Sequence, residues 1–225
     1  MAAGLISEDE FLYFTQHFLS LNAKNRDTWE LRESIGDKKK VYLYKRVSVV
    51  DKPGTDQSCR PFIPDEITTV EEEDSGRLES GTDSSTLSPS GETTSDITVP
   101  VHLAYEYHVV YSQSYNVPVL YFNVYKADGS LLSLEEVWDR VPDVYRDRLQ
   151  HDRWTFLTQQ EHPILGRPYF QLHPCHTADL MEQVTGLSSP GQNSNYIVAW
   201  LSAVGPVVGL DLPLTYAQMT VEKPP

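Results

Sequence analysis

Residues 102–111 constrain the fold more than any other part of this 225-residue chain. Large apolar side chains stand at every second position of the run, and they are Leu103, Tyr105, Tyr107, Val109 and Tyr111. A period of two places all of them on one face of a β-strand, whereas an α-helix would spread them around its axis. The run therefore predicts a strand with a buried face, and with it a β-sheet.

Further strands are predicted on both sides of this run. In chain order they cover residues 29–32, 38–50, 115–126, 154–160 and 169–172. Gly36-Asp37 can join the first two as a hairpin, and Asp128-Gly129 is a turn that closes the third. Pro118 cannot donate a ladder hydrogen bond, so it indicates an edge or a bulge near the start of that third strand.

Helices are predicted near both ends of the chain and after the strands. They cover residues 8–21, 133–149, 178–184 and 196–204. Capping boxes, Ser7 with Glu10 and Ser133 with Glu136, mark the starts of the first two, and Pro142 should kink or split the second. This order of elements predicts an α+β fold in which helices pack mainly on one face of an antiparallel sheet.

Residues 65–97 differ in composition from the rest of the chain. They hold ten acids, one base and 13 Ser or Thr residues, and no aromatic residue. Such a stretch cannot bury enough apolar surface to offset the entropy of ordering it. We therefore expect one domain over residues 1–225, with 65–97 as a flexible acidic insertion within it. The net charge of −14 argues against broad electrostatic binding to nucleic acid or anionic lipid.

The cysteine count and the apolar segments indicate a soluble, cytoplasmic protein. Cys59 and Cys175 are too few for a disulfide framework, and the first residues show no basic start and no apolar run typical of a secretory signal. Residues 193–210 are apolar, but Gly205-Pro206 breaks them and they fall short of the roughly 20 residues that a membrane span needs. A buried helix is the expected structure there.

Chemistry is concentrated in residues 161–181, which hold His162, His173, Cys175 and His176. Cys175 stands directly before a predicted helix, where the helix N-terminus and a nearby imidazolium favour the thiolate form. A buried structural cysteine fits the same pattern equally well. A zinc site lacks an obvious second pair of ligands, and a Cys–His peptidase needs an oriented base that sequence cannot show.

The residues around this cysteine resemble the E2-like conjugating enzymes of autophagy. The resemblance rests on the His173–Ala178 motif (HPCHTA) followed by Met181, on Glu161-His162-Pro163, and on the blocks 105–122 and 195–216. It implies an E2-like core, with Cys175 as the nucleophile that forms a glycyl thioester, and it implies neither a cofactor nor a metal.

Within that family, residues 105–122 are most similar to the branch that conjugates the ubiquitin-like modifier autophagy-related protein twelve. The resemblance implies that the E1-like enzyme autophagy-related protein seven loads Cys175, and that a lysine of autophagy-related protein five accepts the modifier. Two alternatives stay open: a lipid-conjugating E2 of the autophagy-related protein three type, and a non-catalytic E2-like binding module. The acidic residues 1–21 argue against the membrane-sensing helix that we expect of the lipid-conjugating type.

One departure from ubiquitin E2 enzymes concerns the oxyanion. Those enzymes carry His-Pro-Asn before the cysteine, and the Asn amide helps to stabilise the oxyanion, whereas this chain has His162-Pro163-Ile164. Another donor must then face the thioester. The candidates are Tyr115, Gln159, Gln160 and His173. Of these, Tyr115 and His173 are the supporting residues that we expect beside Cys175, although His173, like His162, can serve only to shape its loop.

Overall fold

A computed structural model describes residues 4–34, 37–51, 101–149, 156–186 and 195–218 of the chain. The predicted insertion 65–97 and Cys59 lie outside the described residues, as do Gly36 of the expected hairpin turn and residues 154–155 of an expected strand.

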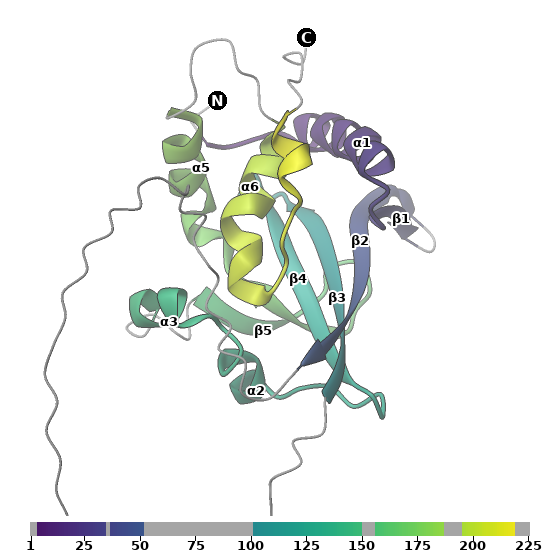
Figure 1. Cartoon of the computed structure of the whole chain (residues 1–225). Helices are drawn as coiled ribbons and strands as arrows, with labels where there is room; N and C mark the ends of the chain where they lie inside the picture. Colours follow the sequence, from purple (N-terminus) through teal and green to yellow (C-terminus); the bar gives the residue numbers. More distant parts are fainter. Residues whose placement is uncertain (1–3, 35–36, 52–100, 150–155, 187–194, 219–225) are drawn as a thin grey trace, which may run out of the picture.

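The sheet is antiparallel throughout its described part, as predicted. Its strands are β1 (Glu30–Ser34), β2 (Asp37–Asp51), β3 (Val101–Ser112), β4 (Val117–Lys126), β5 (Leu157–Glu161) and β6 (Pro168–Leu172). Their order across the sheet is β1-β2-β3-β4-β6-β5 (Figure 1). Between β4 and β6 the paired residues are Tyr121 with Gln171 and Phe122 with Phe170. Pro118 lies three positions before this pairing, in a part of β4 whose strand partner is β3, which explains how an interior strand tolerates a proline.

The helices also follow the predicted pattern. They are α1 (Glu8–Asn25), α2 (Leu134–Trp138), α3 (Asp143–Leu149), α5 (Thr177–Gly186) and α6 (Tyr196–Val204). Both capping boxes form, and Pro142 separates α2 from α3 as expected. Short 3₁₀ helices complete the chain: η1 (Pro174–His176), η2 (Gly205–Val208) and η3 (Leu214–Gln218).

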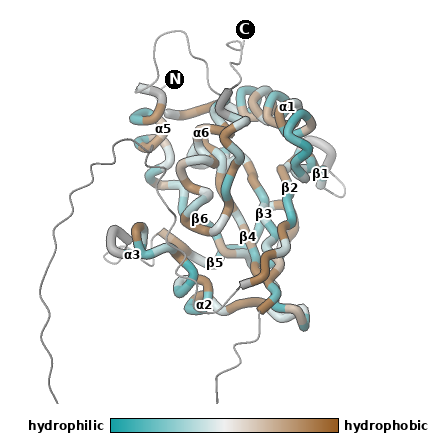
Figure 2. The backbone as a smooth tube through the Cα atoms, viewed as in Figure 1, coloured by the Kyte–Doolittle hydropathy of each residue, from teal (hydrophilic) through white to brown (hydrophobic). Residues whose placement is uncertain are grey.

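The main core lies between the sheet and α6, which α1 and α5 flank (Figure 1). Phe18 of α1, Leu43 of β2 and Ile197 of α6 are completely buried in it. The hydrophobic colouring in Figure 2 runs through the strands and through α6. In the described part of the chain, no helix is both long enough and apolar enough to cross a membrane.

Part of the second face of the sheet is buried as well, which the alternation in β3 did not indicate. His108 and Val110 point to this face, and both are buried. Val110 joins an aromatic cluster formed by Tyr42, Tyr44, Val119, Tyr121 and Tyr169. Ile164 and Leu165, in the turn between β5 and β6, pack against this cluster. The β5–β6 turn thus covers the aromatic cluster on the second face with the apolar side chains of Ile164 and Leu165.

Candidate active site

Cys175 occupies the bend between the last strand and the helix that follows it. Strand β6 ends at Leu172, the His173 N–H donates to Phe156 O at 2.8 Å, and Cys175 then lies in η1, which leads directly into α5. Its thiol is free and exposed to solvent. This exposure excludes the buried structural cysteine, one of the alternatives that the sequence left open.

His173 contacts the main chain of Cys175. The imidazole Nδ1 of His173 accepts the Cys175 N–H at 3.2 Å, and His173 is the N-cap residue of η1. Because Nδ1 accepts this bond, it carries no proton there. The side chain of His173 therefore fixes the backbone from which the thiol projects.

Tyr115 reaches the same place from a distant part of the sequence. It lies in the turn between β3 and β4, and its ring meets the His173 imidazole edge-on, with centroids 5.7 Å apart and planes at 81°. Tyr115 is 42% exposed. His173 thus contacts both of the other predicted site residues, Tyr115 through its ring and Cys175 through its main-chain N–H.

Gln159 and Gln160, the other two candidates for oxyanion donors, lie away from this group. In the β5–β6 hairpin Leu157 pairs with Leu172 at the end near Cys175, whereas Gln159 pairs with Phe170 and Gln160 with Tyr169. Two or three residues of strand separate the glutamines from that end, which corresponds to roughly 7–10 Å. The register of the hairpin therefore places Gln159 and Gln160 outside the group formed by Cys175, His173 and Tyr115.

The tripeptide His162-Pro163-Ile164 lies still farther from Cys175. It forms the turn at the opposite end of the same hairpin, beyond the pair Glu161–Pro168. Four strand residues, roughly 13 Å, separate that pair from Leu172. The comparison of this tripeptide with the His-Pro-Asn of ubiquitin E2 enzymes was wrong in position, because no side chain at residue 164 could face the thioester.

His162 instead shapes its own turn and joins a buried polar chain that sequence reasoning missed. Its Nδ1 accepts the N–H groups of Ile164 and Leu165, each at 3.2 Å, and its Nε2 lies 3.0 Å from His108 Nδ1. His108 Nε2 in turn lies 3.2 Å from a carboxylate oxygen of Glu106. A signal was present in the sequence, since His108 and Glu106 are the polar members of the alternation in β3.

Burial controls the charge of this polar chain. Burial first, and then the nearby His108 and Arg167, lower the pKa of His162 to about 3, and the carboxylate of Glu106 opposes this only in part. The hydrogen bonds from His108 and from the Tyr169 hydroxyl lower the pKa of Glu106. The chain therefore holds neutral His162 at one end and an ionised carboxylate at the other.

The surroundings of Cys175 offer no set of metal ligands. In the described ranges, no group of three or more His, Cys, Asp or Glu side chains converges on one point. His176 and Asp179 face each other across 4.0 Å, and both are exposed. The zinc alternative therefore has no ligand set in this part of the chain.

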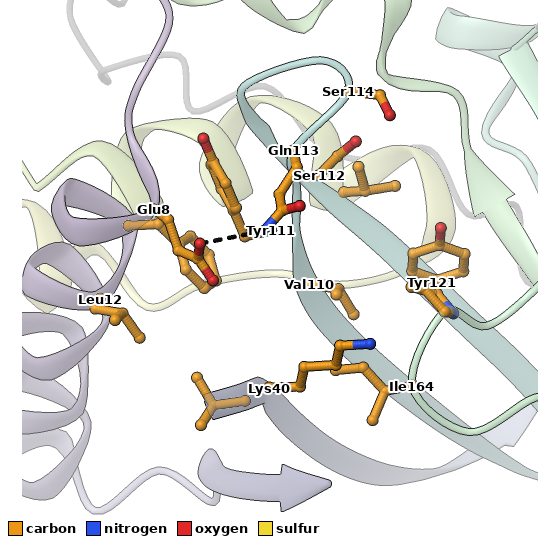
Figure 3. A pocket seen from close by; sticks show the side chains of 14 residues that line it. Glu8, Leu12, Lys40, Val110, Tyr111, Ser112, Gln113, Ser114, Tyr121 and Ile164 are labelled. Atoms are coloured by element: carbon orange, nitrogen blue, oxygen red, sulfur yellow. Dashed lines mark hydrogen bonds between the residues drawn. The ribbon is translucent and has the colours of Figure 1, made fainter. Parts of the chain in front are cut away.

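A cavity of about 280 Å³ opens on the second face of the sheet, beside the β3–β4 turn (Figure 3). The start of α1, strands β2 to β4 and the β5–β6 turn supply the described part of its lining. At its edge Gln113 Nε2 donates to Glu8 at 3.2 Å, as the dashed line in Figure 3 shows. Cys175 is not among the described residues that line this cavity, so the cavity and the cysteine bend are separate features of the surface.

Comparison with known proteins identifies the family of the chain. Residues 9–215 match the family described as autophagocytosis associated protein, active-site domain. The chain is similar to the ubiquitin-like-conjugating enzyme ATG10 of Homo sapiens, with 54% identity over 119 residues, which are 52% of this chain and 54% of that protein. The enzymes of the same name from Arabidopsis thaliana and Dictyostelium discoideum are 46% and 38% identical, over 49% of this chain and 51% and 53% of their own. The chain spans about half the length of the curated relatives that it matches.

Proposed function

Because this chain belongs to the family of autophagocytosis associated proteins defined by their active-site domain, we propose that it is an E2-like enzyme that carries a ubiquitin-like modifier as a thioester on Cys175. The observation that carries the proposal is the exposed thiol of Cys175 in its HPC motif, at the bend into α5. An exposed thiol can meet the large protein partners that such a relay requires.

The reaction consists of two acyl transfers. In the first, the Cys175 thiolate attacks the thioester that joins the modifier's terminal glycine to the E1-like enzyme, a new C–S bond forms, and the E1 thiolate leaves. In the second, a lysine amine attacks the carbonyl, an amide C–N bond forms, and Cys175 leaves as a thiolate while the amine loses a proton to solvent. A cysteine suits both steps because its thiolate is both a strong nucleophile and a good leaving group.

His173 and Tyr115 support the reaction in different ways. His173 is a positioning residue, since its Nδ1 holds the Cys175 N–H. Tyr115 orders His173 through the edge-on ring contact, and its hydroxyl is the donor that we assign to the oxyanion. Their position beside Cys175 favours them over Gln159 and Gln160.

The partners follow from the family branch. The modifier is autophagy-related protein twelve, the activating enzyme is the E1-like autophagy-related protein seven, and the acceptor is a lysine of autophagy-related protein five, in the cytoplasm during autophagosome formation. The similarity to three enzymes named ATG10 supports this branch. The 225 residues act as one domain, with residues 65–97 as an insertion that takes no part in the chemistry.

The test is a loading reaction with purified components. The chain is incubated with the E1-like enzyme, ATP and either autophagy-related protein twelve or the free form of the modifier that the lipid-conjugating type transfers, and the products are separated without reductant. We expect an adduct with autophagy-related protein twelve that dithiothreitol removes, and its transfer to autophagy-related protein five when that protein is added. Loading with the other modifier alone would indicate the lipid-conjugating type, and no adduct with either would indicate a binding module.

A further inference from the structure

Residues Gly4–Ser7, called the strap below, run from α5 to the start of α1 (Figure 1). The Tyr196 hydroxyl of α6 donates to Gly4 O at 2.7 Å. Gly4 has a φ of +82°, and a Cβ at this position would overlap the carbonyl oxygen of Ala178 in α5. The strap therefore lies directly against the backbone of the helix that follows Cys175, at a distance that only glycine permits.

The other end of the strap holds the turn that carries Tyr115. The Ile6 N–H donates to Asn116 O at 2.9 Å, and the Tyr111 hydroxyl lies 2.9 Å from Ile6 O and 3.2 Å from Asn116 Oδ1. Ile6 itself is buried. Asn116 adopts a left-handed conformation with a φ of 54°, and its N–H donates to Ser112 O at 2.8 Å. These bonds fix the backbone immediately after Tyr115.

We propose that the strap is a positioning element of the active site, which sets the distance between the Tyr115 turn and the helix that begins beside Cys175. Gly4 fixes the strap against α5, and Asn116 receives it at the turn. This inference rests on the proposed function, because it assigns the strap to the thioester chemistry of Cys175. Displacements of about 1 Å at a reacting centre can cost up to roughly a hundredfold in rate, so an element that fixes this distance affects catalysis directly.

Two pairs of variants separate positioning from stability. Tyr196→Phe removes the hydroxyl that donates to Gly4 O, and its control, Tyr107→Phe, removes a buried hydroxyl that donates to Val208 O at 2.8 Å. Gly4→Ala displaces the strap, and its control, Gly129→Ala, meets the same left-handed strain at a φ of +84° but has no atom within 4 Å of the new Cβ. Each control matches the chemical change but lies away from the strap.

Two measurements are made on the full chain. The first is the rate at which the preformed thioester discharges to free lysine, and the second is the NMR signal of the His173 imidazole, which the Tyr115 ring shifts. We expect Gly4→Ala and Tyr196→Phe to slow discharge by about tenfold and to move the His173 signal toward its position in Tyr115→Leu. The two controls should keep the discharge rate and the His173 signal of the unaltered chain. This should hold even where they lower the unfolding temperature as much as the strap variants do.

The proposal is overturned if the His173 signal of the Tyr196→Phe variant coincides with that of the Tyr107→Phe control. This conclusion holds whatever the discharge rates of the two variants are. Tyr196→Phe keeps the side-chain volume, so this outcome stays measurable even if Gly4→Ala does not fold. If the unaltered chain forms no thioester, the proposed function fails, while the NMR comparison still decides whether the strap places the Tyr115 ring.

Discussion

The imidazoles of His108 and His162 share a hydrogen bond, with 3.0 Å between His108 Nδ1 and His162 Nε2, in the interior of the second face of the sheet. Because His162 Nδ1 already accepts two main-chain N–H groups, the proton of neutral His162 is on Nε2 and is donated to His108. His108 Nε2 lies 3.2 Å from a carboxylate oxygen of Glu106. Both ring nitrogens of neutral His162 are engaged, so a second proton on that ring must break the bonds from the Ile164 and Leu165 N–H groups.

This arrangement predicts a loss of stability in mild acid. The pKa of His162 is about 3 in the folded chain, below the ordinary value of 6.5, so the unfolded chain binds a proton that the folded chain does not. The stabilisation is fully present above pH 6.5 and is lost as the pH falls toward 3. Between pH 7 and pH 5 the free energy of unfolding should decrease by about 2 kcal/mol, measured by urea denaturation.

His162→Gln should reduce this pH dependence, although the variant is less stable at pH 7 because the bonds to the turn are altered. The matched control is His102→Gln, which removes an exposed histidine from the same strand as His108 and should leave the dependence as it was. An equal slope in His162→Gln and in the unaltered chain would assign the acid sensitivity to other groups.

The ion pair between Lys45 and Asp27 should be a second point of sensitivity. The Lys45 ammonium lies 2.6 Å from Asp27 Oδ1, and the two side chains are only 10% and 12% exposed. Burial raises the pKa of Asp27, but the hydrogen bonds from Lys45 and from the Thr28 N–H outweigh it, so the pKa is lowered. Lys45→Met leaves a buried carboxylate without its cation and should cost about 3 kcal/mol in urea denaturation.

Adding Asp27→Asn to the Lys45→Met variant should recover part of that loss, because a neutral amide can keep the contact with the Tyr216 hydroxyl. The readout is a double-mutant cycle. Additive losses in the double variant would show that Lys45 and Asp27 do not stabilise each other.

Local elements of the fold were predictable because their signals lie in adjacent residues. The alternation in β3, the capping boxes at Ser7 and Ser133, and the break at Pro142 all depend on neighbours within a few positions. The same holds for Cys175, whose place before a helix was visible in the sequence.

Contacts between distant residues were not predictable in this way. The edge-on contact of Tyr115 with His173 depends on how the β3–β4 turn lies against the end of β6, and the His108–His162 bond depends on a hairpin that folds over the second face. Residues near Cys175 in sequence, such as Gln160, were candidates for the site, but the hairpin register carries them away from it. Sequence distance along a strand translates directly into distance from the site.

The role of His173 as a cap predicts different results for two substitutions. His173→Ala removes the acceptor of the Cys175 N–H, whereas His173→Asn supplies a side-chain oxygen suited to capping. We expect His173→Ala to slow discharge of the thioester by about tenfold, a cost of about 1.4 kcal/mol, and His173→Asn to recover most of the rate. Equal rates in the two variants would contradict the capping role and point to the imidazole itself.

Replacement of residues 65–97 by a short Gly/Ser linker should leave both stability and conjugation close to those of the unaltered chain. The segment contains no aromatic residue and carries a net charge of −9, so its removal sacrifices no core. Thermal unfolding and the yield of conjugate measure the two properties. A loss of several kcal/mol, of the kind that follows removal of a packed element, would show that the segment contributes to the core.

The last prediction concerns the nucleophile itself. Cys175→Ala should form no adduct with the modifier, while Cys175→Ser should trap an oxyester that resists dithiothreitol and yields to alkali, because an alkoxide is a poorer leaving group than a thiolate. Both variants should fold, since the exposed thiol makes little contribution to the core. The matched control is Cys59→Ala, which should load and transfer as the unaltered chain does. Non-reducing gels of the loading reaction give the comparison, and a thiol-sensitive adduct that persists in Cys175→Ala but disappears in Cys59→Ala would move the nucleophile to Cys59.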